Sequence, residues 1–127
     1  MERVGSESSV AGATREDATL VSRSRPIADV SFRAFLAARD PPRLQWASHE
    51  GLELAGTGVA ARLTASGTDR FESVRTAAEG LFADADCSNS DAPRPRLVGG
   101  FAFLDDHEAD PPWTGLPAAG IVLPELQ

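Results

Sequence analysis

Two adjacent glycines, Gly99 and Gly100, interrupt the apolar stretch at residues 94–106, "RPRLVGGFAFLDD", and limit what can pack beside it. The side chains around them are those of a buried strand: Leu97, Val98, Phe101 and Phe103. Each glycine weakens a strand by about 0.5–1 kcal/mol relative to alanine. The pair therefore predicts close approach by a backbone, a helix or a bulky side chain. A ligand is the alternative, although "VGGFAF" matches neither G-x-G-x-x-G nor the Walker pattern.

The other apolar positions divide the chain into short elements separated by turn signals. Helical spacing predicts helices within residues 29–42 and 68–86. Alternation predicts a first strand within 18–27, at a sheet edge, and two or three antiparallel strands joined by hairpins within 43–67. Further strands are expected at 94–106 and 118–127, with loops at 87–95 and 105–117. This order lacks a βαβ rhythm and predicts an α+β fold, an antiparallel sheet with two helices on one face.

Both predicted helices carry recognisable start signals. In the first, Ser31 is the expected N-cap, the apolar residues recur at helical spacing, and Asp40-Pro41-Pro42 ends the helix. In the second, Thr68 is the expected N-cap. Its apolar stripe consists of Phe71, Val74, Ala78, Leu81 and Phe82.

Length and charge restrict the functional classes. The 127 residues suit one domain, at 18–127, preceded by a polar tail at 1–17 that we expect to be disordered. The net charge is -7 and lysine is absent, which argues against a nucleic-acid partner. The acidic surface indicates a halophile, or else an ordinary acidic protein. Because no apolar run suits a membrane span or a signal peptide, we expect no membrane partner and a cytoplasmic location.

Few residues suggest chemistry by themselves. The loop "DDHEAD" offers possible ligands for a hard cation, or is a solvated acidic loop; its candidates are Asp105, Asp106, His107, Glu108 and Asp110. His49 is a turn residue unless a nucleophile lies nearby. Cys87 is expected in a loop, with no local base to activate it. Trp46 and Trp113 are expected to anchor the core and a loop, respectively, rather than to form ligand platforms.

Four phrases, in order and in register from about residue 19 to 127, resemble isochorismate synthases of the chorismate-utilising enzymes. They are "LVSRSRPI", the run "RLQWASHEGLELAGTGVAARLTASGTDRF" with its helix opened by G-x-x-R-F, "RPRLVGGFAFLDD" beside the family's "RP-x-x-FGGFAFD", and "PPWTGLPAAGIVLPEL". The composition suggests a haloarchaeal version. The resemblance implies the N-terminal part of an anthranilate synthase component I-like fold, in which the glycine-bearing strand joins a two-layered β core.

The resemblance also implies an activity that these residues cannot perform alone. Isochorismate synthases convert chorismate to isochorismate, for menaquinone biosynthesis, with Mg²⁺, a lysine base, a glutamate acid and further glutamates on the metal. These groups belong to the C-terminal part of the family fold, and this chain has no lysine. We therefore assign no catalytic, cofactor-binding or metal residue here, and expect an inactive N-terminal fragment produced by truncation, frameshift or gene splitting.

Three alternatives stay open at this point. The chain could derive from another chorismate-utilising enzyme, such as salicylate synthase or anthranilate synthase component I. It could be a non-catalytic binding or regulatory module that pairs with a separate catalytic chain. It could also be an unrelated acidic α+β domain.

Overall fold

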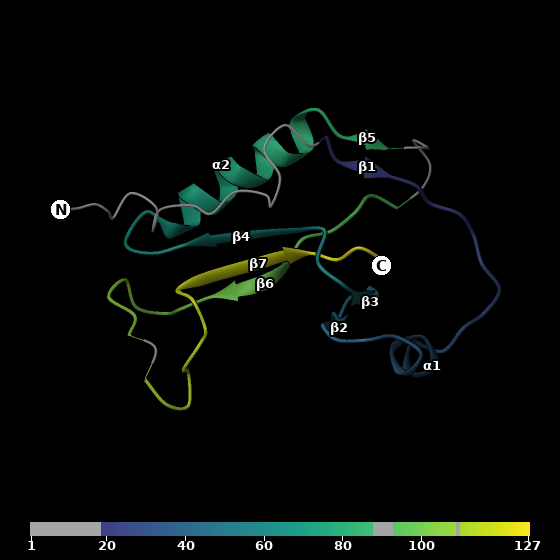
Figure 1. The fold of residues 1–127 in the computed structure, drawn as a ribbon, viewed down its shortest axis with the longest axis horizontal. Coiled ribbons are helices and arrows are strands. Elements are labelled where there is room, and N and C mark those ends of the chain that lie inside the picture. Colours follow the sequence, from purple (N-terminus) through teal and green to yellow (C-terminus); the bar gives the residue numbers. More distant parts are fainter. Residues whose placement is uncertain (1–18, 88–92, 109) are drawn as a thin grey trace.

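A computed structural model describes residues 19–87, 93–108 and 110–127 (Figure 1). The predicted disordered tail, residues 1–17, lies outside the described residues. The elements in chain order are β1 (Val21–Ser22), α1 (Phe32–Ala37), β2 (Arg43–Ala47), β3 (Glu53–Thr57), β4 (Ala61–Ala65), α2 (Arg70–Ala83), β5 (Asp86–Cys87), β6 (Val98–Phe101) and β7 (Ala119–Leu123).

The described strands form three small sheets. β2 pairs with β3, and β7 lies between β4 and β6, all antiparallel. The α+β class and the antiparallel sheets are thus confirmed. One pairing differs from the prediction, because β1 and β5 pair in parallel over two residues each. The two helices are also divided between sheets: α2 packs on β4 and β7, whereas α1 packs on β2 and β3 (Figure 1).

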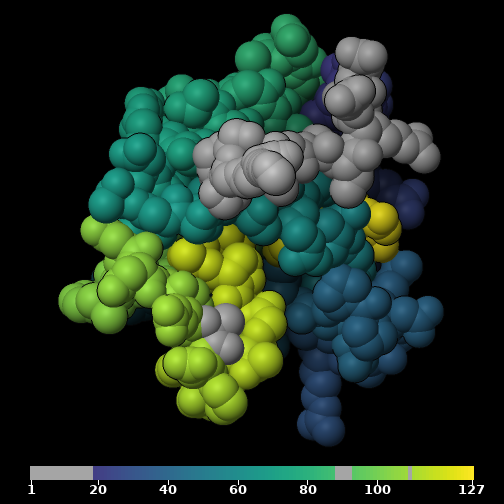
Figure 2. All heavy atoms as spheres, turned by 60° about the vertical axis from the view of Figure 1, so that its left-hand side comes forward, coloured from purple at the N-terminus to yellow at the C-terminus, as the bar shows by residue number. Residues whose placement is uncertain are grey.

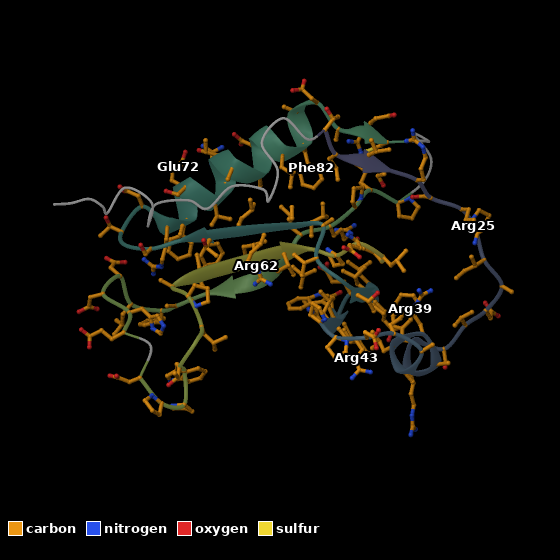
Figure 3. All side chains as sticks on the ribbon, in the orientation of Figure 1. Arg25, Arg39, Arg43, Arg62, Glu72 and Phe82 are labelled. Atoms are coloured by element: carbon orange, nitrogen blue, oxygen red, sulfur yellow. The ribbon has the colours of Figure 1, made fainter. Side chains whose placement is uncertain are left out.

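The core lies between α2 and one face of the β4–β7–β6 sheet. Strand alternation sends every second side chain to that face, and the buried cluster consists of Leu63, Ala65, Val74, Ala119 and Ile121. Phe82 points from α2 toward the sheet (Figure 3). Arg62, between two buried residues of β4, is exposed and points away from α2 (Figure 3). The α2 stripe is less buried than its spacing predicts, since Phe71 remains 54% exposed.

The β2–β3 hairpin has the turn that its sequence predicts. Ser48 N–H donates to the Leu52 carbonyl, and Gly51 N–H donates to Ser48. Gly51 has φ +94°, a conformation that glycine adopts without steric cost. The third strand of this region does not continue the hairpin. It leaves at Gly58, where φ is +75°, and β4 pairs with β7 instead.

The helix starts confirm one predicted cap and correct the other. Ser31 Oγ accepts a hydrogen bond from Ala34 N–H at 3.1 Å, as expected for an N-cap. In α2 the N-cap residue is Asp69 rather than Thr68, and its side chain makes no capping bond. Gly67, whose φ is +80°, lies directly before Thr68 in the turn that leads into the helix.

Neither of the helices within residues 19–87, 93–108 and 110–127 combines the length and the apolar character that crossing a bilayer requires.

Candidate functional site

A cleft lies between the β2–β3 hairpin and the start of β6. Its volume is about 320 Å³, and its lining consists of Trp46, Leu52, Leu54, Arg96, Leu97, Val98 and Gly99. Trp46 and Leu54 are directly opposite each other in the hairpin, so they share one face of it. Gly99 borders the cleft through its backbone.

The lining determines what this cleft can do chemically. Its walls are apolar or aromatic, and Arg96 is the one charged residue among them. Such a surface suits an apolar group that carries a negative charge. No lining residue is a carboxylate, a histidine, a cysteine or a lysine, so the cleft holds no general acid or base. The prediction that Trp46 anchors the core is wrong, because its side chain is 51% exposed and lines this cleft.

The two glycines of β6 have different surroundings. A Cβ atom on Gly99 would collide with the Gly120 carbonyl oxygen and would lie 2.7 Å from the Ile121 Cα atom. The predicted close approach by another backbone is confirmed there, and the backbone is that of β7. A Cβ atom on Gly100 would meet nothing within 4 Å. Among the described residues, nothing therefore lies close enough to Gly100 to exclude a side chain there.

A buried arginine joins the start of α2 to the end of β6. The Arg70 side chain is 2% exposed, and one of its terminal nitrogens lies 2.5 Å from a carboxylate oxygen of Asp105. Its guanidinium also donates to the carbonyl oxygens of Gly67, Ala102 and Phe103. Arg70 Nε is buried without a hydrogen-bond partner.

Aromatic rings cover one side of this arginine. The Arg70 guanidinium carbon lies 4.4 Å from the ring centre of Phe71, a cation–π contact. Phe71 in turn stacks on Phe101 of β6 with ring centres 4.6 Å apart. Arg70 therefore has a structural role. Its hydrogen bonds, its ion pair and its cation–π contact are all made within the protein, so its guanidinium is not directed at a substrate.

The acidic loop that follows β6 does not gather its candidates around one point. Asp105 is bound to Arg70, and His107 Nε2 lies 3.2 Å from the Leu116 carbonyl oxygen. Among the described residues, no three His, Cys, Asp or Glu side chains converge as metal ligands would. These residues therefore do not fit a magnesium site. Figure 2 shows this loop and the segment from α1 to β2 on either side of the β7 region.

The remaining candidate residues, His49, Cys87 and Trp113, lie in three different parts of the fold. His49 lies in the exposed turn between β2 and β3, as predicted. Cys87, expected in a loop, is instead the half-buried second residue of β5, opposite Ser22. Trp113 lies in the loop before β7 as predicted. Its backbone N–H donates to the Asp110 carbonyl, and its side chain is 58% exposed.

Comparison with known protein families gives one match. The model of the family described as "Chorismate binding enzyme" matches residues 6–127. The chain belongs to this family. No curated protein matches the chain. No solved structure matches it either.

Local sequence reasoning missed the buried contact between Arg70 and Asp105. Arginine is usually a surface residue, so a helical position by itself does not suggest burial. The two residues stand in two separate phrases noted above, G-x-x-R-F at the start of α2 and "RPRLVGGFAFLDD". In this chain Leu104 stands directly after "FAF", and Asp105, one position later, binds Arg70.

Proposed function

We propose that this chain is the N-terminal portion of an isochorismate synthase, which supplies scaffold to an enzyme that converts chorismate to isochorismate. The family match over residues 6–127 carries the proposal. The isochorismate-specific step is supported by the four sequence phrases and by their order. The proposal is thus more specific than the family description, because it names isochorismate as the product.

The chemistry explains why we expect no activity from these residues alone. Adding water at one carbon of chorismate and removing a hydroxyl from another requires a base and an acid beside the ring. The chain has no lysine to act as the family base. In the described residues no carboxylate cluster suits a magnesium ion either. We place the base, the acid and the Mg²⁺ ligands in polypeptide outside these 127 residues, either continuous with the chain or separate from it.

Complementation tests this proposal directly. The 127-residue chain is mixed with a separately produced C-terminal portion of an isochorismate synthase, and chorismate and Mg²⁺ are added. We expect isochorismate from the mixture and none from either part alone. A Leu63→Asp chain, which places a charge at a core position that is 1% exposed, is the control and should not complement.

The product distinguishes the alternatives. Salicylate or anthranilate formed with the corresponding partner portions, in the absence of isochorismate, would assign the chain to those synthases instead. A failure of all three partners, with the chain shown to be folded, would contradict the proposal. The menaquinone pathway and the cytoplasmic location stay predictions.

A further inference from the structure

Buried residues are distributed unevenly along the fold. In the core between α2 and the β4–β7–β6 sheet, Leu63, Ala119 and Leu123 are each at most 1% exposed. By contrast, none of the described residues from 19 to 54 is buried, although they include α1, β2 and the start of β3. Segments with few buried apolar contacts open at a lower free energy than the core does. We refer to α1 and the β2–β3 hairpin, residues 32–57, as the flap.

The flap is attached to the core at the base of its hairpin. Thr57, the last residue of β3, exchanges two backbone hydrogen bonds with Leu126, at 3.0 and 3.1 Å. The Gln127 side chain in turn bonds to the backbone N–H and C=O groups of Arg96, at 2.9 and 3.0 Å. The buried residues of the flap are those at this base, residues 55–57. One end of the flap is therefore held in place.

The other end of the hairpin, its tip, faces β6 across the cleft instead of packing on it. Trp46, Leu52 and Leu54 line the cleft from the tip, and residues 96–99 line it from the start of β6. The space between them has a volume of about 320 Å³. Trp46 is 51% exposed and Leu52 is 41% exposed, so this wall of the cleft remains in contact with water. Bringing the two walls together would remove apolar surface from water, which is favourable.

The chain segments that enter and leave the flap are suited to movement. Residues 23–31, which lead into α1 along the outside of the fold, are all exposed (Figure 1). On the other side, Ala60 N–H already donates to the Leu123 carbonyl of the core sheet. The hinge on that side is therefore restricted to Gly58 and its neighbour. Hinges lie at a few residues at the ends of elements, and glycine has the widest choice of backbone angles.

We propose that the flap swings as one unit about its base, so that the hairpin tip moves toward β6 and away from it, and the cleft closes and opens. Helix α1 moves with the hairpin because it packs on β2 and β3. In the closed position Trp46 and Leu52 lie against Leu97 and Val98. This inference concerns a motion within the 127-residue chain and does not depend on the proposed function.

Distances between pairs of spin labels, measured by pulsed electron paramagnetic resonance, test this motion. In a Cys87→Ser chain, one label is attached at Ala47→Cys, near the tip in β2, and the other at Gly80→Cys on α2. Both positions are exposed, and a Cβ atom at Gly80 meets nothing within 4 Å. We expect the distance distribution of this flap-to-core pair to be about twice as wide as that of a pair within the core.

Two further label pairs are matched controls. Arg62→Cys with Gly80→Cys joins β4 to α2 within the core, and Arg33→Cys with Ala47→Cys joins α1 to β2 within the flap. Both pairs should give narrow distributions. A flap-to-core distribution as narrow as these would overturn the proposal, and so would an equally wide distribution within the flap, because the hairpin or α1 would then be unfolding. If the Ala47→Cys chain does not fold, Glu53→Cys, its exposed partner in the hairpin, replaces it.

Ammonium sulfate shows whether the motion closes this cleft, because sulfate strengthens the burial of apolar surface. At high concentrations of the salt, the flap-to-core distribution should shift and become narrower, while that of the core pair stays unchanged. Leu52→Lys places a charge on the closing wall and should abolish this response. Leu104→Lys, at an exposed leucine outside the cleft lining, is the control and should retain it. A distribution that does not respond to the salt, or a response that both substitutions affect equally, would overturn the proposal.

Discussion

At the scale of single residues, Arg70 holds together parts of the chain that are distant in sequence. Its guanidinium donates to the Gly67 carbonyl, which precedes α2, and to the Ala102 carbonyl, which follows β6. The Asp105 carboxylate compensates its charge. A buried arginine without a counter-charge is costly, whereas a paired and hydrogen-bonded one is tolerated. Arg70 and Asp105 should therefore behave as a coupled unit.

A double-mutant cycle measures this coupling. Asp105→Ala should lower the free energy of unfolding by about 1–3 kcal/mol, because Arg70 keeps three carbonyl partners but loses its counter-charge. In an Arg70→Ala background the same change should cost close to nothing. Urea unfolding of the four chains gives the values. Equal effects of Asp105→Ala in both backgrounds would contradict the pairing.

The two glycines provide a matched pair of substitutions. Gly99→Ala should destabilise the fold by about 1–3 kcal/mol, because its methyl group would be forced into the backbone of β7. Gly100→Ala should change stability by less than about 1 kcal/mol, since its methyl group has open space. Thermal or urea unfolding of both variants is the measurement, and comparable losses would contradict the asymmetry.

At the scale of elements, local sequence signals predict where helices, turns and strands lie along the chain, but they do not predict which strands pair with each other. The Ser31 cap, the turn at Gly51 and the alternation in β2 and β3 depend on neighbouring residues, and all three are confirmed. Alternation identifies β4 and β7 as strands but cannot specify that they pair, because they are separated by more than fifty residues. The division into several sheets was therefore not predictable from local patterns.

The functional surfaces were less predictable than the elements. The half-exposure of Trp46 depends on how the hairpin lies relative to β6, which no local pattern encodes. The burial of Arg70 depends on carbonyls and a carboxylate supplied more than thirty residues away. Single-residue rules failed at both positions because tertiary contacts decide burial.

Helix α2 also carries an ion-pair cluster with a defined pH dependence. Arg75 bonds to Glu72 at 2.6 Å and to Glu79 at 2.6 Å on the exposed face of α2. The hydrogen bond from Arg75, and then its charge, lower the pKa of Glu72 below its ordinary value of 4.5. The resulting stabilisation is complete above pH 4.5 and is lost as the pH falls through the lower folded-state pKa.

Substitution of Glu72 tests this dependence. Glu72→Gln should unfold at a lower urea concentration than the wild type at pH 7, and the difference should shrink as the pH falls below 4.5. Arg75→Gln removes the cause of the shift and should show the same trend. A wild-type advantage that persists unchanged to pH 2.5 would contradict the assignment.

At the scale of the whole molecule, the chain combines a small sheet core with open edges and an acidic surface. Membership in the chorismate-binding enzyme family gives this scaffold its context. The described residues provide an apolar cleft with one guanidinium among its lining residues, and a buried arginine paired with a carboxylate. Under the proposed function, these residues supply scaffold, and the base, the acid and the Mg²⁺ ligands lie in polypeptide outside them.

Chorismate turnover by the purified, folded 127-residue chain tests this separation most directly. With Mg²⁺ present, chromatography should show that chorismate is consumed no faster than in the buffer blank, and that no isochorismate appears. Isochorismate formed at a rate proportional to chain concentration would contradict the account, because the base and the acid would then lie within these residues.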